Sequence, residues 1–303
     1  MYRLSRRSFV AALAALAVAP TVGVTAAGRL KVVATFTVLA DLVSNIAGDH
    51  VSLTTLVGPN ADAHVYEPSP ADARRLAEAD LVLVNGLGFE GWIDRLIEAS
   101  GYDGPIMVAS EGVAALETAK HQIDPHAWQD LANGRLAVGN IARALSAVDP
   151  RHADDYRRYA QRYDRQLAAL DLQIRGWFAA IPPNERKVIT SHDAFQYFGR
   201  AYGIDFLAPV GLSTQDEPSA GEIAALVKQM RKEGIRALFV DNIADRRLMQ
   251  QLGREASAVI GGTLYSDSLS TAEGPAATYI DMFRHNASEI VRVLQASALR
   301  PSR

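Results

Sequence analysis

The sequence predicts an α/β protein of two lobes, each a mostly parallel sheet flanked by helices, with one long helix joining them. Short β-branched runs alternate with longer amphipathic segments, a pattern typical of parallel sheets. The alternation occurs on both sides of one long helical stretch. The 303 residues suffice for two ordinary hydrophobic cores. We therefore expect an N-terminal lobe at 28–148, a linking helix at 149–181 and a C-terminal lobe at 182–303.

Residues 1–27 are predicted to be a cleaved export signal of the twin-arginine type and not part of the fold. Ser5–Val10 reads SRRSFV, and an alanine-rich stretch and small residues suited to cleavage follow it. The apolar run is interrupted by Pro20 and is shorter than the roughly 20 residues that a membrane span requires. The alternatives are the general export route, or a chance arginine pair before a short anchor helix.

Four short β-branched or apolar runs in the first lobe are predicted strands. Their length suits strands better than helices, and an amphipathic segment follows most of them. The strands are Lys31–Phe36, Val51–Val57, Leu81–Val84 and Ile106–Ala109, and the helices between them include Val38–Ala47 and Pro70–Ala79.

The linking helix is predicted from a long stretch without strand signals. From about His152 to Ala180 the chain contains no proline, and prolines stand just outside both ends. Apolar residues recur there every three or four positions: Tyr156, Tyr159, Tyr163, Leu167, Leu170, Ile174 and Phe178. About 30 helical residues would give a rod of roughly 45 Å. Because similar strand–helix patterns flank it, we interpret it as a rigid connector and not as an ordinary core helix.

The second lobe repeats the pattern of the first. Four further short runs are predicted strands, and amphipathic segments of helical length lie between them. The strands are Lys187–Thr190, Phe206–Val210, Ala237–Val240 and Val259–Leu264, and the helices include Ser219–Glu233 and Arg246–Ser257.

The composition argues against several classes of function. The formal net charge is −3, which gives no indication of binding to nucleic acid or to an anionic membrane surface. The chain contains no cysteine, which excludes disulfides, thiolate metal ligands and thiol nucleophiles. A lipid anchor on the mature N-terminus would also need a cysteine. We therefore expect an exported, unanchored and monomeric protein in the periplasm.

Three histidines and one aspartate are candidate metal ligands: His64, His126, His192 and Asp267. Each lies where a predicted strand gives way to a loop, and their wide spacing excludes a local zinc finger. Because open parallel sheets bind ligands beyond the carboxyl ends of their strands, two facing lobes would bring two candidates each to one cleft. Three imidazole nitrogens and a carboxylate oxygen suit zinc and its first-row neighbours. A site filled entirely by protein ligands favours a carrier over an enzyme.

Neighbouring residues support three of the four candidates. A ligating imidazole usually donates its other N–H to an oxygen. The candidates for this oxygen are Tyr66 or Glu67 for the first histidine, Asp124 for the second and Asp193 for the third. Asp124 could instead cap a helix, and Asp193 lies at an apparent helix start, where acids often act as caps. Asp267, taken by itself, could be a turn or helix-cap residue as easily as a metal ligand.

The remaining histidines are interpreted mainly as surface or capping residues. These are His50, His152 and His285. His121 differs from them, because it lies in a polar loop shortly before His126 and is a candidate for a mobile auxiliary ligand.

At these residues the chain resembles the solute-binding proteins of zinc and manganese ABC importers, the ZnuA and TroA type. The resemblance runs from about Leu30 to Leu294 and includes five blocks in family order. The blocks are His64–Pro70 (HVYEPSP), Asp124–Trp128 (DPHAW), Ser191–Phe198 (SHDAFQYF), Ser213–Ser219 (STQDEPS) and Ser266–Leu269 (SDSL). The chain departs from many zinc-specific members because the stretch before the second histidine is short and contains only His121.

This resemblance implies two lobes joined by a long helix and a metal ion bound between them by His64, His126, His192 and Asp267. It also implies delivery of the ion to an ABC permease in the inner membrane, driven by a cytoplasmic ATPase, with no enzymatic activity. Members that resemble manganese carriers often have glutamate where this chain has His192, so a third imidazole favours Zn2+ over Mn2+.

Two alternatives outside this class remain at the level of sequence. A metal-dependent hydrolase could use the same four ligands with an added water, and Glu67 is the best candidate for its general base. No His-Glu-x-x-His helix supports that alternative. A receptor for an organic ligand, such as a chelated metal, could share the two-lobed architecture, but it would leave the four predicted ligands unexplained.

Overall fold

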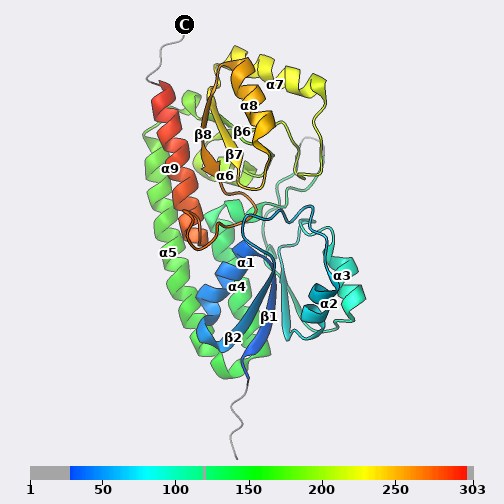
Figure 1. The fold of residues 1–303 in the computed structure, drawn as a ribbon. Coiled ribbons are helices and arrows are strands. Elements are labelled where there is room, and N and C mark those ends of the chain that lie inside the picture. Colours follow the sequence, from blue (N-terminus) through cyan, green and yellow to red (C-terminus); the bar gives the residue numbers. More distant parts are fainter. Residues whose placement is uncertain (1–27, 119–120, 299–303) are drawn as a thin grey trace, which may run out of the picture.

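The computed structural model describes residues 28–118 and 121–298, which form two lobes stacked end to end beside a long helix (Figure 1). Each lobe contains a four-stranded parallel sheet with helices packed on it, so the predicted two-lobed α/β class is confirmed. The predicted export signal at 1–27 lies outside the described residues. None of the described helices combines the length and the apolar character that a membrane crossing requires.

The N-terminal lobe is built on a sheet with strand order β2-β1-β3-β4, in which every neighbouring pair is parallel. Its elements are β1 (Leu30–Phe36), α1 (Thr37–Ala47), β2 (Val51–Val57), α2 (Pro70–Ala77), β3 (Leu81–Val84), α3 (Ile93–Ser100), β4 (Ile106–Val108) and α4 (Leu131–Val148). The two central strands are almost wholly buried, because helices cover both faces of the sheet.

The C-terminal lobe repeats this topology with strand order β6-β5-β7-β8, again entirely parallel. Its elements are β5 (Lys187–Ile189), α6 (Gln196–Tyr202), β6 (Asp205–Leu207), α7 (Ala220–Glu233), β7 (Ala237–Asp241), α8 (Arg246–Ala256), β8 (Val259–Leu264) and α9 (Tyr279–Ala298). The predicted strand Phe206–Val210 is wrong at its C-terminal end. Strand β6 stops at Leu207, and Pro209 has no N–H to donate to a neighbouring strand.

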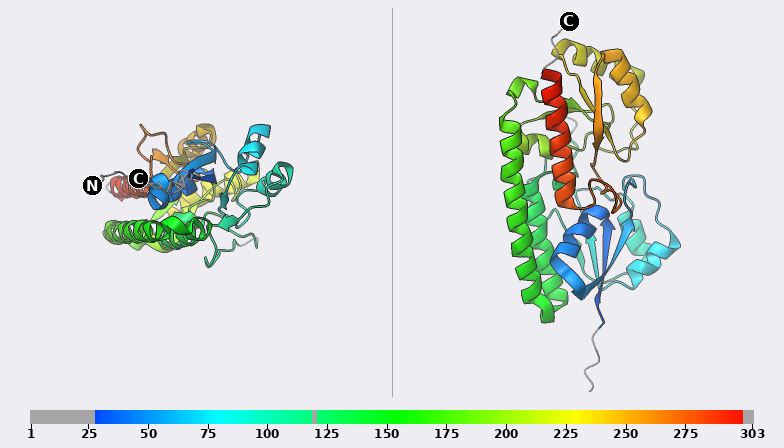
Figure 2. Two further views of the ribbon diagram at one scale, coloured as in Figure 1. Left: turned by 90° about the horizontal axis from the view of Figure 1, so that it is seen from below. Right: turned by 60° about the vertical axis from the view of Figure 1, so that its left-hand side comes forward.

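Helix α5 (Ala153–Ala179) runs along both lobes and connects them (Figure 2). Its 27 residues correspond to a length of about 40 Å. One face is buried at intervals of three or four residues: Tyr156, Ala160, Tyr163, Leu167, Leu170, Ile174 and Phe178. Tyr159, which the sequence pattern also placed on this face, is only partly buried. Helix α9 lies beside α5 and also contacts α1, so the C-terminal helix adds a second connection between the lobes.

One apolar core extends through both lobes. It begins between the first sheet, α1 and α4, and it continues along α5 and α9 to α6 and one face of the second sheet. A separate, smaller core lies under α7 and α8 on the other face of that sheet. Strand β7 shows the division, because Phe239 belongs to the shared core whereas Leu238 and Val240 belong to the smaller one. Side-chain packing therefore holds the two lobes together in addition to the chain connection.

The carboxyl ends of the two sheets meet at the junction between the lobes. Thr37, directly after β1, accepts a hydrogen bond on its hydroxyl from the N–H of Leu269, which follows β8 (2.8 Å). In both sheets the strand order reverses between the two central strands, and in open parallel sheets this is the place where ligands bind. The loops that follow β1, β2, β5, β7 and β8 therefore surround a single region of the molecule.

Asp41 on α1 connects three helices near this junction. Its Oδ2 accepts hydrogen bonds from the backbone N–H of Tyr279 at the start of α9 (3.0 Å) and from the hydroxyl of Tyr163 on α5 (3.3 Å). Burial raises the pKa of Asp41 to about 6, because the two hydrogen bonds to its charged form compensate only in part. The ionised carboxylate therefore destabilises the folded protein at neutral pH.

We expect Asp41→Asn to stabilise the protein at neutral pH by as much as about 2 kcal/mol. The pKa of Asp41 is raised from 3.8 to about 6, so the stability that its protonated form contributes is fully present below 3.8 and is lost as pH rises through about 6. Thermal unfolding of both proteins from about pH 4 to about pH 8 measures the difference. The advantage of the variant should grow up to about pH 6 and then stay constant. A variant less stable than the wild type at the alkaline end would contradict this account of Asp41.

Candidate metal centre

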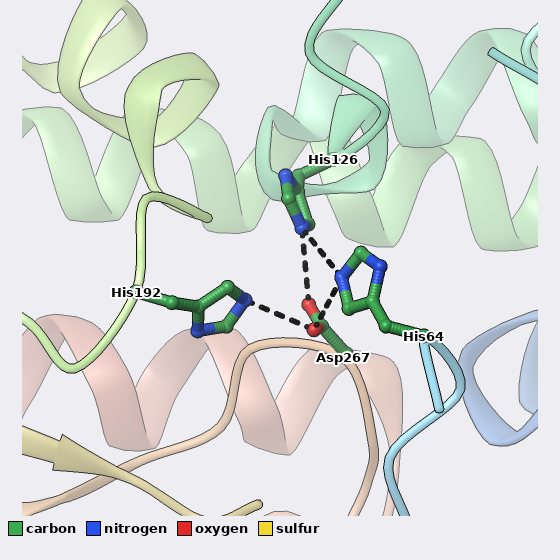
Figure 3. Close-up of side chains that lie close together, drawn as sticks. All are labelled: His64, His126, His192 and Asp267. Carbon is green, nitrogen blue, oxygen red and sulfur yellow. Dashed lines mark hydrogen bonds and ion pairs between the residues drawn. The ribbon is translucent and has the colours of Figure 1, made fainter. Parts of the chain in front are cut away.

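All four candidate residues converge between the lobes (Figure 3). One donor atom from each of them lies within 4.8 Å of the others. The Nε2 atoms of His64 and His192 lie 3.3 Å and 3.0 Å from Oδ2 of Asp267. The Nε2 atom of His126 lies 3.6 Å from the other oxygen, Oδ1. Three imidazoles therefore surround one carboxylate.

His126 lies immediately before a short 3₁₀ turn, Ala127–Gln129, that leads into α4. His126 follows β4 in chain order, and a segment bridged between Glu117 and Ile123 lies between them. Oδ1 of Asp124 accepts hydrogen bonds from the backbone N–H of His126 (2.9 Å) and from its Nδ1 (2.8 Å). The predicted contact of Asp124 with His126 is therefore present, and it turns Nε2 toward the cluster.

His192 lies just beyond β5, and its Nδ1 is 2.6 Å from Oδ2 of Asp241, the last residue of β7. Strands β5 and β7 are neighbours at the centre of the sheet, so these two residues meet at its carboxyl edge. Asp241 therefore takes the role for which the sequence offered Asp193, either as the partner of His192 or as a helix cap. The Oδ1 of Asp193 instead accepts a hydrogen bond from Nε2 of Gln196. An acid at the carboxyl end of a buried strand is the signal that identifies Asp241.

Asp267 follows β8 of the C-terminal lobe, but residues of the N-terminal lobe hold it in place. The carbonyl of the preceding residue, Ser266, accepts hydrogen bonds from the indole of Trp128 (2.9 Å) and the side-chain amide of Gln129 (2.7 Å). Beyond Asp267, the N–H of Leu269 makes the hydrogen bond to the N-terminal lobe described above. The chain around Asp267 is thus anchored on both sides, and its carboxylate is fully buried.

His64 lies on the long loop between β2 and α2. Its backbone N–H donates to Oδ1 of Asp62 (2.9 Å), and its side chain is 6% exposed. Neither residue predicted to orient His64 does so in the structure. The hydroxyl of Tyr66 donates to Asp72 at the start of α2 (2.9 Å), and Glu67 is exposed.

Electrostatics couple the charges within the cluster. Burial alone raises the pKa of Asp267, but the positive charges of His192 and His126 outweigh burial and hold this pKa well below its ordinary value. Burial alone lowers the pKa of His192, but the carboxylates of Asp267 and Asp241 outweigh burial and raise it well above its ordinary value. The centre of the cluster therefore strongly favours a positive charge.

Three buried carboxylate oxygens in and beside the cluster have no hydrogen-bond partner within the described parts of the chain. They are Oδ1 of Asp267, Oδ2 of Asp124 and Oδ1 of Asp241. A buried acceptor without a donor costs free energy, and an anionic one costs more. Oδ1 of Asp267 faces Nε2 of His126 at the centre of the cluster, where a cation would compensate its charge.

Aromatic side chains pack around the cluster. Phe89 lies edge-on to His64, with ring centroids 4.9 Å apart, and Trp128 lies 5.4 Å from His126. Phe89 and Trp128 also contact each other, with centroids 4.6 Å apart. Electrostatic attraction is stronger in such an apolar setting than in water.

The other histidines lie outside the cluster. His121 is exposed and its Nδ1 contacts Glu117. His50 and His152 stack on each other near the start of α5, with ring centroids 3.9 Å apart, and His285 contacts the backbone of β8. Among the residues that the structure describes, the four candidates form the only group of three or more histidines and acids close enough to hold one metal ion.

The fold and the cluster together define a class of protein: a two-lobed binding protein with a fixed helical linker and its ligand groups buried between the lobes. The chain belongs to the ZnuA family, described as the periplasmic component A of zinc-uptake complexes. The model of this family matches residues 32–293. The family that the five sequence blocks indicated is therefore confirmed.

Relatives from several bacteria match nearly the whole chain. The manganese ABC transporter substrate-binding lipoprotein PsaA of Streptococcus mitis is 33% identical over 276 residues, which cover 88% of this chain and 89% of PsaA. The iron-binding protein YfeA of Yersinia pestis is 34% identical over 272 residues, which cover 88% of this chain and 86% of YfeA.

Solved structures of related proteins share the fold of this chain. The periplasmic zinc-binding protein TroA of Treponema pallidum gives a TM-score of 0.84 at 30% identity, covering 88% of this chain and 99% of TroA. A manganese-bound periplasmic metal-binding protein from Candidatus Liberibacter asiaticus gives a TM-score of 0.79 at 30% identity, covering 88% of this chain and 100% of that protein.

We expect Asp241→Asn to lower the pKa of His192 in the metal-free protein, because the neutral amide removes one of the two charges that raise it. Asp193→Asn is the matched control, since this acid follows His192 directly but contacts Gln196 and not the imidazole. NMR titration of the histidine side chains measures both variants, and the control should change the pKa of His192 far less. Equal effects of the two substitutions would contradict the pairing of His192 with Asp241.

Proposed function

We propose that this protein is the periplasmic receptor of an ABC importer and binds one divalent metal ion, Zn2+, through His64, His126, His192 and Asp267. The observation that carries the proposal is the convergence of three imidazole nitrogens and one carboxylate on a single buried point. Members of the family are substrate-binding proteins of ABC transporters and not enzymes, which supports a role as a carrier.

The separations between donor atoms support a compact shell. In a tetrahedral zinc site with bonds of about 2.0–2.1 Å, neighbouring donors lie about 3.3 Å apart. The three histidine–carboxylate separations here are 3.0, 3.3 and 3.6 Å, and Nε2 of His64 lies 3.3 Å from Nε2 of His126. Small inward adjustments of the side chains would therefore complete the coordination of one ion.

The outer partners of two imidazoles also support metal binding. Nδ1 of His126 and Nδ1 of His192 each face a carboxylate, Asp124 or Asp241, at 2.8 and 2.6 Å. With the ring proton held at Nδ1, the Nε2 lone pair is available to a metal ion. The bound ion would replace the positive charge that the pKa shifts of His192 and Asp267 show the cluster to favour.

We propose zinc over manganese because three of the four donors are imidazole nitrogens, which suit Zn2+ better than the oxygen-preferring Mn2+. A manganese receptor of the same family is the alternative. Relatives differ in this respect, since PsaA is described as a manganese transporter protein, YfeA as iron-binding and TroA as zinc-binding. The choice of zinc therefore rests only on the residue types of the four proposed ligands.

A metal-dependent hydrolase finds little support at the site. Glu67, the general base that the sequence suggested for it, is exposed on the loop after His64. The proposed shell also leaves no donor position for a reactive water, because protein atoms supply all four.

The proposed partners are a permease in the inner membrane and its cytoplasmic ATPase, by analogy with the importers of the relatives.

We further propose that the protein is exported through the twin-arginine machinery and that residues 1–27 are removed. The mature protein would then consist of two lobes, 28–148 and 182–303, joined by 149–181. The relatives named above include lipoproteins, whereas this chain contains no cysteine for a lipid, so we propose an unanchored monomer. Cell fractionation and the mass of the mature protein test these points.

We expect calorimetry to show one tight Zn2+ site per chain and weaker binding of Mn2+. Alanine at His64, His126, His192 or Asp267 should weaken Zn2+ binding by more than about 100-fold, since even the loss of an outer partner typically weakens it 10- to 100-fold. His121→Ala is the control, because this exposed histidine lies outside the cluster.

Thermal unfolding provides an independent check on the same variants. An ion that binds only the folded protein stabilises it by about 4 kcal/mol at about 1,000 times the dissociation constant. Zinc at this concentration should therefore raise the melting temperature of the wild type and of His121→Ala, and it should raise that of the four ligand variants much less. No shift for the wild type would count decisively against the proposed function.

We expect the affinity for Zn2+ to decrease as pH falls, because protons and the metal ion compete for the same nitrogens. The pKa of His192 is raised in the metal-free protein, so this competition should begin above the ordinary histidine value of 6.5. Calorimetry at several pH values and in buffers of different ionisation enthalpy measures both the affinity and the protons released. Affinity independent of pH between about 5 and about 8 would contradict the role of the imidazoles.

A further inference from the structure

The loop between β6 and α7 of the C-terminal lobe contacts the loop of the N-terminal lobe that carries His64. It contains Ser213–Ser219, one of the five sequence blocks, and none of its residues belongs to the four-residue cluster. The hydroxyl of Thr214 donates to Oδ2 of Asp62 at 2.6 Å. The side-chain amide of Gln215 donates to the backbone carbonyl of His64 at 3.0 Å. Two neighbouring residues of the C-terminal lobe therefore hold a loop of the N-terminal lobe.

Both hydrogen bonds act on the backbone of His64. Asp62 accepts the Thr214 hydroxyl on Oδ2 and the N–H of His64 on Oδ1 (2.9 Å). Gln215 binds the carbonyl on the other side of the same residue. The peptide groups before and after His64 are thus both fixed by the opposite lobe, one through Asp62 and one directly.

His64 depends on this contact more than the other members of the cluster do. His126 and His192 each have a buried carboxylate on Nδ1, and hydrogen bonds on both sides fix the chain around Asp267. In the described parts of the chain, His64 is the one imidazole of the cluster whose Nδ1 has no such carboxylate. It is also the one member that is not fully buried.

The two loops in contact occupy equivalent places in the two lobes. One joins β2 to α2 and the other joins β6 to α7, and the two sheets have the same strand order. Each loop ends in Glu-Pro-Ser, and Ser69 and Ser219 cap the following helices with the same reciprocal pair of hydrogen bonds. The capped helices fix the ends of both loops, and Thr214 and Gln215 connect the central part of one loop to that of the other.

We propose that Thr214 and Gln215 are positioning residues that hold His64 in the metal shell from the opposite lobe and thereby limit the rate at which the ion leaves. The inference rests on the proposed metal-binding function. It implies that withdrawal of the loop between β6 and α7 loosens His64 while the other three proposed ligands stay in place.

Stopped-flow release of Zn2+ to a chromogenic chelator tests this proposal. We expect Thr214→Val and Gln215→Ala each to accelerate release about three- to fivefold, the effect of losing one ordinary hydrogen bond. Thr214→Ser retains the hydroxyl and should release zinc at the wild-type rate. Gln251→Ala is the matched control for Gln215→Ala. Gln251 is an exposed glutamine on α8, and in the described part of the chain its side chain donates a hydrogen bond to Glu255 of the same helix.

A second measurement does not require metal. Hydrogen exchange of the peptide around 61–67 in the metal-free protein should be faster in Thr214→Val and Gln215→Ala than in the wild type and both controls. In a His64→Ala background, Thr214→Val should no longer change the rate of zinc release, whereas a general loss of stability would still accelerate it.

The outcomes separate this proposal from the proposed function. A wild-type protein that binds no zinc overturns the metal-receptor function, and the exchange of 61–67 then still tests whether the loop is held. A protein that binds zinc but releases it at the same rate in Thr214→Val, Gln215→Ala and the wild type overturns the positioning role alone. Unchanged exchange in both variants also overturns it.

Discussion

The buried carboxylate of Asp267 is the group around which the site is organised. A lone anion in an apolar interior is very unfavourable, and in practice it takes up a proton or finds a positive charge. Here the charges of His192 and His126, together with hydrogen bonds from His192 and His64, lower the pKa of Asp267, while the same carboxylate helps to raise the pKa of His192. A divalent cation at this point would satisfy the carboxylate without protonating the imidazoles. In the proposed function, binding of a metal ion to the cluster would release protons, which would couple metal affinity to pH.

Bringing these four residues together depends on two sheets of the same topology that face each other. Each sheet directs the loops after its strands toward the junction, and no single lobe contains the whole cluster. The shared core along α5 and α9 fixes the distance between the lobes, because it is continuous with the packing of both. The hydrogen bond from Trp128 to Ser266 then fixes the chain beside Asp267 against the opposite lobe. Little reorganisation is left for the moment of binding, which favours affinity.

The sequence predicted most of the fold because its signals are local. Short buried runs such as β3 and β7 are apolar throughout, and the long apolar stripe of α5 repeats at helical spacing. The end of β6 was misplaced because the apolar run continues through Pro209, which cannot complete the strand pattern. The four candidates were found because polar residues after the strands of an open sheet gather at one edge.

The contacts that orient the candidates were harder to predict. Asp124 lies two residues before His126, so a local pattern was enough to identify it. Asp241 and His192 are 49 residues apart and meet only because β7 is placed beside β5. Asp193, which is adjacent in sequence, was the wrong choice, since the backbone beyond β5 turns its side chain toward Gln196. Contacts that depend on strand order or on the meeting of two lobes leave no signal at fixed spacing.

A receptor of this kind has to hold its ion tightly and still release it to a partner. A fixed linker and a shared core argue against release by a large swing of one lobe, and the anchored chain around Asp267 argues against release by movement of that segment. Among the four proposed ligands, His64 is the one whose backbone is held by a contact at the protein surface, so it would be freed at the smallest cost. Loss of one donor from a closed shell of four opens a coordination position while three donors keep the ion in place. Under the proposed function, a partner that displaced the loop between β6 and α7 would therefore gain access to the metal ion without unfolding the site.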